Sequence, residues 1–258
     1  MKLYNHYLVL HLQSLMAYKT SFILTTLGQF FVSFNVFLGV YFMFERFSSV
    51  KGYSYQEVLL CFSILLLSFA LAECFFRGFD QFSTMIGNGE FDRVLLRPRS
   101  PILQVLGSKI EFSRVGRMLQ GLTMFVYAVK TSPIQWTSLK LFTVGLMLIG
   151  GVVVFASIYL IYAALCFFTL EGLEFMNVLT DGAREYGKYP VDIYGKVVLK
   201  IATFIVPFAL IQYYPFLYLI DQTSNPLVTL LPVVACLFAV PSYLLWRFGL
   251  HHYKSTGS

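Results

Sequence analysis

Long apolar segments without charged residues alternate with short polar segments along most of this chain. An α-helix rises about 1.5 Å per residue, so about 20 apolar residues cross the roughly 30 Å hydrocarbon layer of a membrane. Six segments have this length, or reach it with their flanking residues. They are residues 22–44, 58–76, 115–136, 141–170, 201–220 and 227–246. The pattern predicts an all-α polytopic membrane protein with six transmembrane helices.

Two of these spans are irregular. In the third span only residues 118–129 lack charge, so Arg117 must extend its side chain toward the membrane surface. The fifth span contains Pro207 and Pro215. Internal prolines are tolerated in membrane helices when neighbouring groups satisfy the carbonyls that they leave free. We therefore expect both segments to cross the membrane.

Residues 1–20 precede the first span and are weakly amphipathic, with Leu3, Tyr7 and Leu10 on one face. A helix of this kind lies in the plane of the membrane surface. We expect an N-terminal interfacial helix here, on the cytoplasmic side.

Two polar loops, residues 77–114 and 171–200, separate the spans, and the stretch from the first loop to Arg117 carries seven of the 19 Lys and Arg residues. With six spans, both loops and both termini lie on one side of the membrane, and fifteen basic residues lie on that side against four on the other. Basic residues are retained in the cytoplasm. The sequence therefore predicts a multi-pass membrane protein with both termini cytoplasmic.

The first loop also contains a helical pattern. Phe79, Phe82, Met85 and Ile86 recur at helical spacing, and the segment 87–89 (Gly-Asn-Gly) ends the run. The pattern predicts a short amphipathic coupling helix whose apolar ridge binds a soluble partner. Asp92 and Arg93 follow it, where Asp92 would cap the next turn or pair with a basic group of the partner.

Composition supports a membrane protein and excludes several other classes. The chain is 57% hydrophobic and only 12% charged, about half the charge of a soluble domain. The net charge of +6 follows from the cytoplasmic loops, and no basic soluble face is long enough to bind nucleic acid. The four cysteines lack paired spacing, and the pair His251 and His252 has no Cys or carboxylate companion. No metal site is predicted.

Three amides lie at membrane depth: Gln29, Asn35 and Gln212. They could line a substrate path or hold helices together through hydrogen bonds, and the sequence leaves both interpretations open. We expect all three to face the protein interior. No predicted span carries a charge at its centre, which disfavours an ion-coupled carrier. Glu73 and Arg77 are spaced for an ion pair at the end of the second span.

One segment resembles a nucleotide-binding loop. Residues 182–188 match its glycine and lysine spacing, but Tyr189 replaces the Ser or Thr that holds magnesium, and Pro190 interrupts the helix that should follow. We interpret this match as chance. The chain therefore contains no nucleotide-hydrolysis site of its own.

The segment GNGEFDRVLLRPRSPILQVL (87–106) resembles permease subunits of bacterial type-2 ABC exporters. In particular, it is similar to a subfamily of six-span permeases of roughly this length, which have a G-x-φ-D-x-x-L-L-R-P pattern after the second span. The segments YGKYPVDIYGKV (186–197) and IVPFALIQYYP (205–215) are also similar to that subfamily. The resemblance covers the whole chain in length and order of spans.

This resemblance implies a membrane permease subunit and not an enzyme. ATP and magnesium would bind a separate dimer of ATPase subunits, and the chain itself would hold no cofactor. The permease would pair with a second, identical or related, permease in the lipid bilayer. Phe79–Ile86, together with Asp92 and Arg93, would contact the ATPase at the cytoplasmic face of the bacterial cytoplasmic (inner) membrane. Residues 173–186 would form another contact. A non-transporting scaffold that docks a cytoplasmic partner and an ion-coupled carrier are the alternatives.

Overall fold

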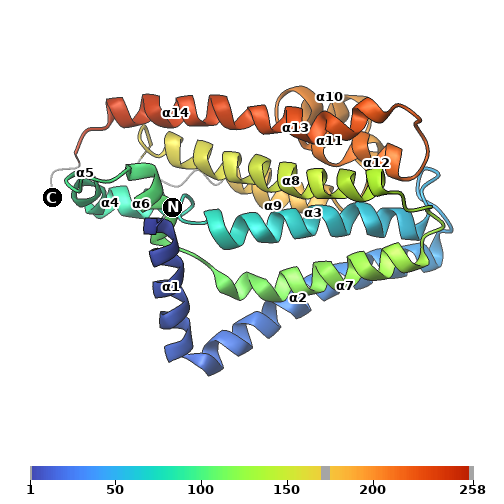
Figure 1. Cartoon of the computed structure of the whole chain (residues 1–258), viewed down its shortest axis with the longest axis horizontal. Helices are drawn as coiled ribbons and strands as arrows, with labels where there is room; N and C mark the ends of the chain where they lie inside the picture. The colour runs from blue at the N-terminus through green and yellow to red at the C-terminus, as the bar shows by residue number, and fades with distance from the viewer. Residues whose placement is uncertain (1, 170–174, 256–258) are drawn as a thin grey trace.

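The long helices run side by side between two ends of the molecule (Figure 1). The computed structural model describes residues 2–169 and 175–255, and the long elements among them are all helical, as the sequence predicts. We call one end the platform end, because α4 (Phe82–Gly87), α5 (Glu90–Leu95) and α6 (Pro101–Ser108) lie there with both termini. The connections 47–54 and 132–137 lie at the opposite, loop end.

Four helical segments have the length and apolarity of a membrane span. They are α2 (Lys19–Arg46), α3 (Tyr55–Phe76), α8 (Ser138–Leu165) and a last segment, Pro226–His252. The last one joins η3 (Pro226–Leu230), α13 (Leu231–Ala235), η4 (Cys236–Phe238) and α14 (Ala239–His252). The central helix α3 is almost entirely buried, and Ser54 and Glu57 form a capping box at its start.

The predicted third span is the shorter helix α7 (Val115–Thr131), which follows η1 (Phe112–Arg114). Its 17 residues extend about 26 Å, from the platform end to the loop end beside α3 and α2. The crossing with α2 is close, since a Cβ on Gly116 would lie 1.9 Å from the Thr26 carbonyl oxygen. Only glycine fits at this contact.

The second polar loop is not wholly at the platform end, which corrects our prediction for 171–200. Helix α9 (Phe175–Tyr186) ascends along α3: Arg184 lies 5.7 Å from the Phe69 ring centre, and Gly187 packs against Leu65. Beyond it, Lys51 of the loop end donates a hydrogen bond of 2.6 Å to the Asp192 carbonyl oxygen. Residues 171–174 lie outside the described residues, as does the predicted end of the fourth span at residue 170.

The predicted fifth span, 201–220, does not cross the bundle as one helix. Helix α10 (Lys196–Phe204) follows η2 (Val191–Tyr194) and is bent by 85° from the segment Phe208–Leu219, which comprises α11 (Phe208–Ile211) and α12 (Tyr213–Leu219). The chain returns to the loop end, where Lys140 bonds to the Asp221 carboxylate at 2.7 Å. This segment is re-entrant, and Pro207, which lacks a backbone N–H, lies at the bend. The chain therefore passes from the platform end to the loop end along α9 and the residues that follow it, up to Asp192.

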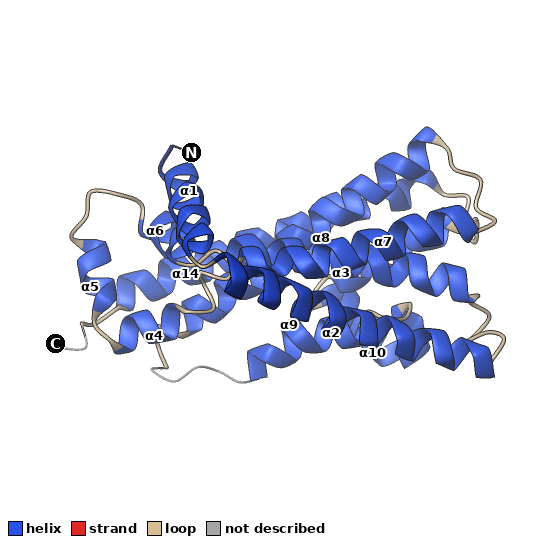
Figure 2. Ribbon diagram, turned by 90° about the horizontal axis from the view of Figure 1, so that it is seen from below, coloured by secondary structure: helices blue, strands red, loops and turns tan. Residues whose placement is uncertain are grey.

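Helix α1 (Lys2–Ala17) lies crosswise to the bundle, as expected for an interfacial helix (Figure 1). It is fastened to the platform end at two points. The Tyr4 hydroxyl donates to the Phe75 carbonyl oxygen at 3.1 Å, and His11 Nε2 lies 3.0 Å from the Gly107 carbonyl oxygen. Figure 2 shows the same arrangement from below, with α1 beside α6.

The crossing by α9 predicts a specific labelling pattern. We expect a cysteine at Lys196 to react from the same side of the membrane as one at Ser49, and a cysteine at Asn88 to react from the other side. All three positions are exposed. The measurement is impermeant thiol labelling of intact cells and of inverted vesicles, with the four native cysteines replaced by alanine. Labelling of Lys196→Cys together with Asn88→Cys would show that α9 does not cross.

Candidate functional site

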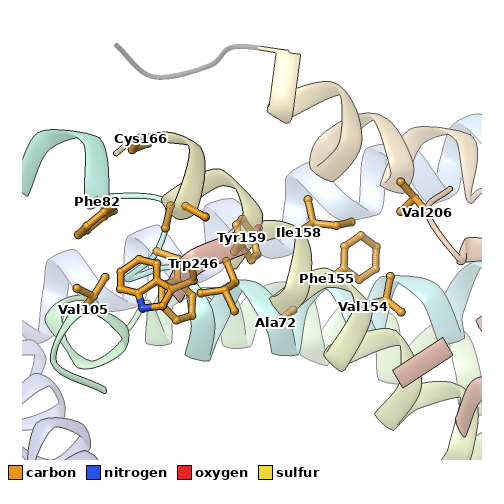
Figure 3. Packing of buried hydrophobic residues seen from close by; sticks show 14 of the residues in the cluster. Ala72, Phe82, Val105, Val154, Phe155, Ile158, Tyr159, Cys166, Val206 and Trp246 are labelled. Carbon is orange, nitrogen blue, oxygen red and sulfur yellow. The ribbon is translucent and has the colours of Figure 1, made fainter. Parts of the chain in front are cut away.

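The platform is built on a cluster of aromatic side chains. The fully buried Phe82 ring lies 4.9 Å from Phe91, 5.0 Å from Phe167 and 5.0 Å from Trp246, measured between ring centres. These residues come from α4, α5, the end of α8 and α14, so the cluster joins the first loop to both later spans. Figure 3 shows Phe82 and Trp246 close to Val105 of α6. Edge-to-face and tilted ring pairs of this kind add to the burial of apolar surface.

The apolar face of α4 therefore points into the protein. Phe79, Phe82 and Ile86 are buried, Met85 is half-buried, and of the predicted coupling residues only Arg93 is exposed. We expected these apolar residues to form an outward ridge. The sequence pattern identified the amphipathic helix but could not say what covers it, since Phe167 and Trp246 are far away in the chain.

Asp92 is held by the C-terminal tail. The Tyr253 hydroxyl donates to Asp92 Oδ1 at 2.9 Å, and the Ser255 hydroxyl donates to Oδ2 at 2.7 Å. The Tyr253 ring also packs edge-on against Phe91. Burial and the hydrogen bond to Asp92 raise the pKa of the Tyr253 hydroxyl to about 12. Asp92 thus fixes the tail to α5, a contact that the sequence pattern did not suggest.

The outer surface of the platform is apolar and basic. The side chain of Leu96 is 85% exposed and that of Leu95 is 41% exposed. Arg93, Arg97 and Arg99 are also exposed around them. This group, which we call the platform tip, sits on α5 and the turn after it, and α5 is anchored beneath by Phe91.

A buried charge cluster joins the platform to the bundle. Glu73 near the end of α3 is 4% exposed and accepts a hydrogen bond from Arg77 at 2.9 Å. Arg117 of α7 donates a second, short hydrogen bond to the same carboxylate, and Arg114 Nη2 lies 3.6 Å from it. Three guanidinium groups from three elements thus converge on one carboxylate. The predicted pair of Glu73 and Arg77 is part of this larger group.

Gln29 and Glu111 complete the cluster. The side-chain oxygen of Gln29 accepts hydrogen bonds from Arg114 at 2.8 Å and from Arg117 at 2.9 Å, which ties α2 to α7. Burial alone would raise the pKa of the Glu111 carboxyl, but Arg77, Lys109 and Arg114 hold it below its usual range. The cluster therefore joins α2, α3, α7 and the end of the first loop.

The other two amides differ from each other. Gln212 is buried, and its Nε2 donates to the Gly187 carbonyl oxygen at 2.7 Å, which fastens the re-entrant segment to the end of α9. Asn35 lies on the exposed side of α2. The expectation that it faces the interior of this chain is wrong, because none of the elements that the structure describes covers Asn35.

Helix α9 carries charges along its length. Arg184 approaches Asp181 at 3.8 Å and Glu185 at 3.2 Å, and Lys188 makes a short ion pair with Glu185. The side chain of Asp181 is 59% exposed and that of Glu185 is 45% exposed. The segment that runs from the platform end to the loop end thus does carry charge, and this segment was not among the predicted spans.

The whole-chain comparisons agree with this architecture. The family model described as ABC-2 family transporter protein matches residues 30–257, which includes most of α2, the platform and all the later helices. The chain belongs to the ABC-2 transporter family. Comparisons with curated proteins and with solved structures found no match. The protein is a multi-pass membrane permease, as the resemblance of 87–106 and the order of spans implied.

The charges of this permease on α9 could have been found in the sequence. Asp181, Arg184, Glu185 and Lys188 are spaced three and four residues apart, which places them on one face of a helix. We assigned this spacing to a cytoplasmic loop because charged residues lower the hydropathy of the segment.

Among the described residues, no group of three or more His, Cys, Asp or Glu side chains is placed to hold a metal ion.

The charge cluster of the permease predicts a strong coupling between Glu73 and Arg117. Each of Glu73→Gln and Arg117→Gln should lower the free energy of unfolding by about 3–5 kcal/mol, because each leaves a buried charge with fewer partners. The double variant should lose less than the sum of the two. The measurement is thermal and denaturant unfolding in detergent micelles. Glu90→Gln, at an exposed position in the platform, is the control, and unchanged stability in Glu73→Gln would contradict the assignment.

Proposed function

We propose that this permease is the membrane subunit of an ATP-driven exporter and that its platform couples it to a separate ATPase dimer. The observation that carries the proposal is the platform tip. An apolar pair, Leu95 and Leu96, is exposed among three arginines at the end of the molecule where both termini lie. Exposed apolar residues rimmed by charge are typical of protein contact sites.

The platform has the rigidity that a coupling element needs. A force applied at the tip reaches Phe91 beneath it, and Phe91 packs against Phe82, Phe167 and the tail residue Tyr253. The tip is therefore connected to the ends of α8 and α14. The charge cluster connects the other end of the first loop to α2, α3 and α7. Movement of the platform would reach five of the crossing helices through these two groups.

The distribution of basic residues indicates which end of the molecule is cytoplasmic. With Lys188, Lys196 and Lys200 assigned to the loop end and Arg184 kept with the platform end, the basic residues divide twelve against seven. The excess still favours a cytoplasmic platform in the inner membrane. A cytoplasmic ATPase would then meet the platform tip, and both termini would be cytoplasmic.

We place the translocation path beside α9 and α2. Arg184 of α9 lines a crevice with Val32 and Val36 of α2, so these two helices flank the same side of α3. Asn35 is exposed one turn from Val32, and Asp181 and Glu185 are exposed on α9. Charged side chains are costly against lipid. A second permease subunit, identical or related, would face this surface. The water in the path between the two subunits would solvate these charges.

Gln29 and Gln212 hold helices together, which is the second of the two roles that the sequence left open. Both amides are engaged in hydrogen bonds between elements of this chain. Only Asn35, of the three, stays a candidate for the path. ATP and magnesium would bind on the ATPase partner, and this chain would supply no cofactor.

A variant of the platform tip tests whether this permease couples to an ATPase or is a scaffold without transport function. Leu96→Ala should reduce co-purification of the ATPase by about tenfold, the loss expected from removing about 1.4 kcal/mol of contact energy. Leu227→Ala, an equally large truncation at an exposed leucine of the loop end, should leave it unchanged. ATPase activity stimulated by the permease should fall in parallel. Undiminished co-purification with Leu96→Ala would remove the tip from the coupling role.

The buried position of Phe82 predicts the opposite behaviour. Phe82→Ala should lower the free energy of unfolding by about 3–5 kcal/mol through the cavity left among Phe91, Phe167 and Trp246. Its effect on the ATPase should follow the amount of folded permease. The measurement is thermal stability together with ATPase co-purification at equal folded abundance. A normal melting temperature with lost association would show that Phe82 contacts the partner.

A further inference from the structure

An apolar recess lies between the crossing helix α9 and the re-entrant segment. Its volume is about 190 Å³, and Leu65 of α3 closes it from behind. Ala183 of α9 lines one wall, Ala202 of α10 lines the opposite wall, and Val206 and Phe208 lie at the bend. The recess therefore exists because the re-entrant segment bends between α10 and α11. Two straight packed helices would not leave this space.

The recess opens sideways, toward an exposed apolar surface of the protein. Tyr186, Val198 and Ile201 belong to its lining and are exposed, so they mark its rim. The neighbouring surface of α10 is apolar, and Phe204 at its end is 84% exposed. Exposed apolar side chains of a membrane protein are favourably placed against hydrocarbon, and in that placement the recess is open to the interior of the bilayer.

The chemistry of the recess selects an apolar occupant. Its one amide, Gln212, already donates to the Gly187 carbonyl oxygen at 2.7 Å and lies 3.1 Å from the Cys61 sulfur. A polar ligand group would lose its hydration here and find few partners. Water needs two to four polar partners, whereas an apolar cavity of about 150 Å³ accepts a molecule the size of benzene. The size suits a segment of an aliphatic chain.

We propose that the recess holds the acyl chain of a bilayer lipid, inserted between α9 and α10. The lipid is a bound component of the permease and not its cargo, so the inference goes beyond the proposed function. The chain would enter between Tyr186 and Ile201 and end near Val206, beside the bend. Its headgroup would remain at the membrane surface where α10 begins with Lys196. The lipid tail would fill the space beneath the re-entrant helix and support its position.

The test is photolabelling of the purified full chain in phosphatidylcholine nanodiscs. A small fraction of the lipid carries a diazirine in the middle of one acyl chain, and mass spectrometry locates the inserted label. We expect label on the recess residues Ala183, Ala202 and Val206, as well as on lipid-facing residues such as Phe204. Label on Phe204 without any label on the three recess residues would overturn the proposal.

Two variants fill the recess from opposite walls. Ala183→Phe and Ala202→Phe should each lower label on Val206 by about tenfold, because an added ring occupies the space of the chain. Label on Phe204 serves as the internal control and should not change. Val234→Phe, which adds the same ring type at an exposed position of α13, should leave both sites unchanged. Undiminished label on Val206 in both filled variants would overturn the proposal, and it would do so without reference to transport or the ATPase.

Discussion

The structure depends on the carboxyl group of Glu73, which is buried where the first loop leaves the bundle. Ionised groups are removed from water at a large cost unless they are paired and hydrogen-bonded. Here Arg77, Arg114 and Arg117 surround the carboxylate, and each belongs to a different part of the chain. The positions of α3, η1 and α7 are therefore set by one shared requirement. This explains how a span as short as α7, with an arginine at its beginning, is held in the bundle.

The need to pair this buried group also divides the first loop into parts that are fixed to the bundle and a part that is exposed. One end of the loop is fastened by charge at Glu73 and Glu111, and its middle is fastened by aromatic packing around Phe82 and Phe91. The residues left free are those of the turn after α5. A loop that was mobile throughout could not transmit the movement of a partner. A loop fixed at two places, with Leu96 exposed between them, can.

Sequence reasoning predicted what depends on local pattern. The apolar runs identified α2, α3, α8 and the last span, and the spacing of Phe79, Phe82 and Ile86 identified an amphipathic segment in the platform. It could not predict what depends on distant partners. Phe82 is covered by Trp246, 164 positions later in the chain, and Asp92 is bound by the tail. Hydropathy also selected 201–220 and passed over α9, because it ranks apolar content and α9 carries exposed charges.

The segment 201–220 is re-entrant, and α9 runs along the bundle in its place. This arrangement has a physical consequence for transport. A crossing helix of uniformly apolar residues would interact with lipid and with a neighbouring subunit in the same way. Helix α9 instead presents Asp181 and Glu185 on one side and the apolar recess with Ala183 on another. An apolar environment is favoured on the second side and a hydrated one on the first. Because Gln212 joins the end of α9 to the re-entrant segment, a rotation of α9 would move the lipid-facing recess and the charged surface together. The two environments are thus coupled through one helix.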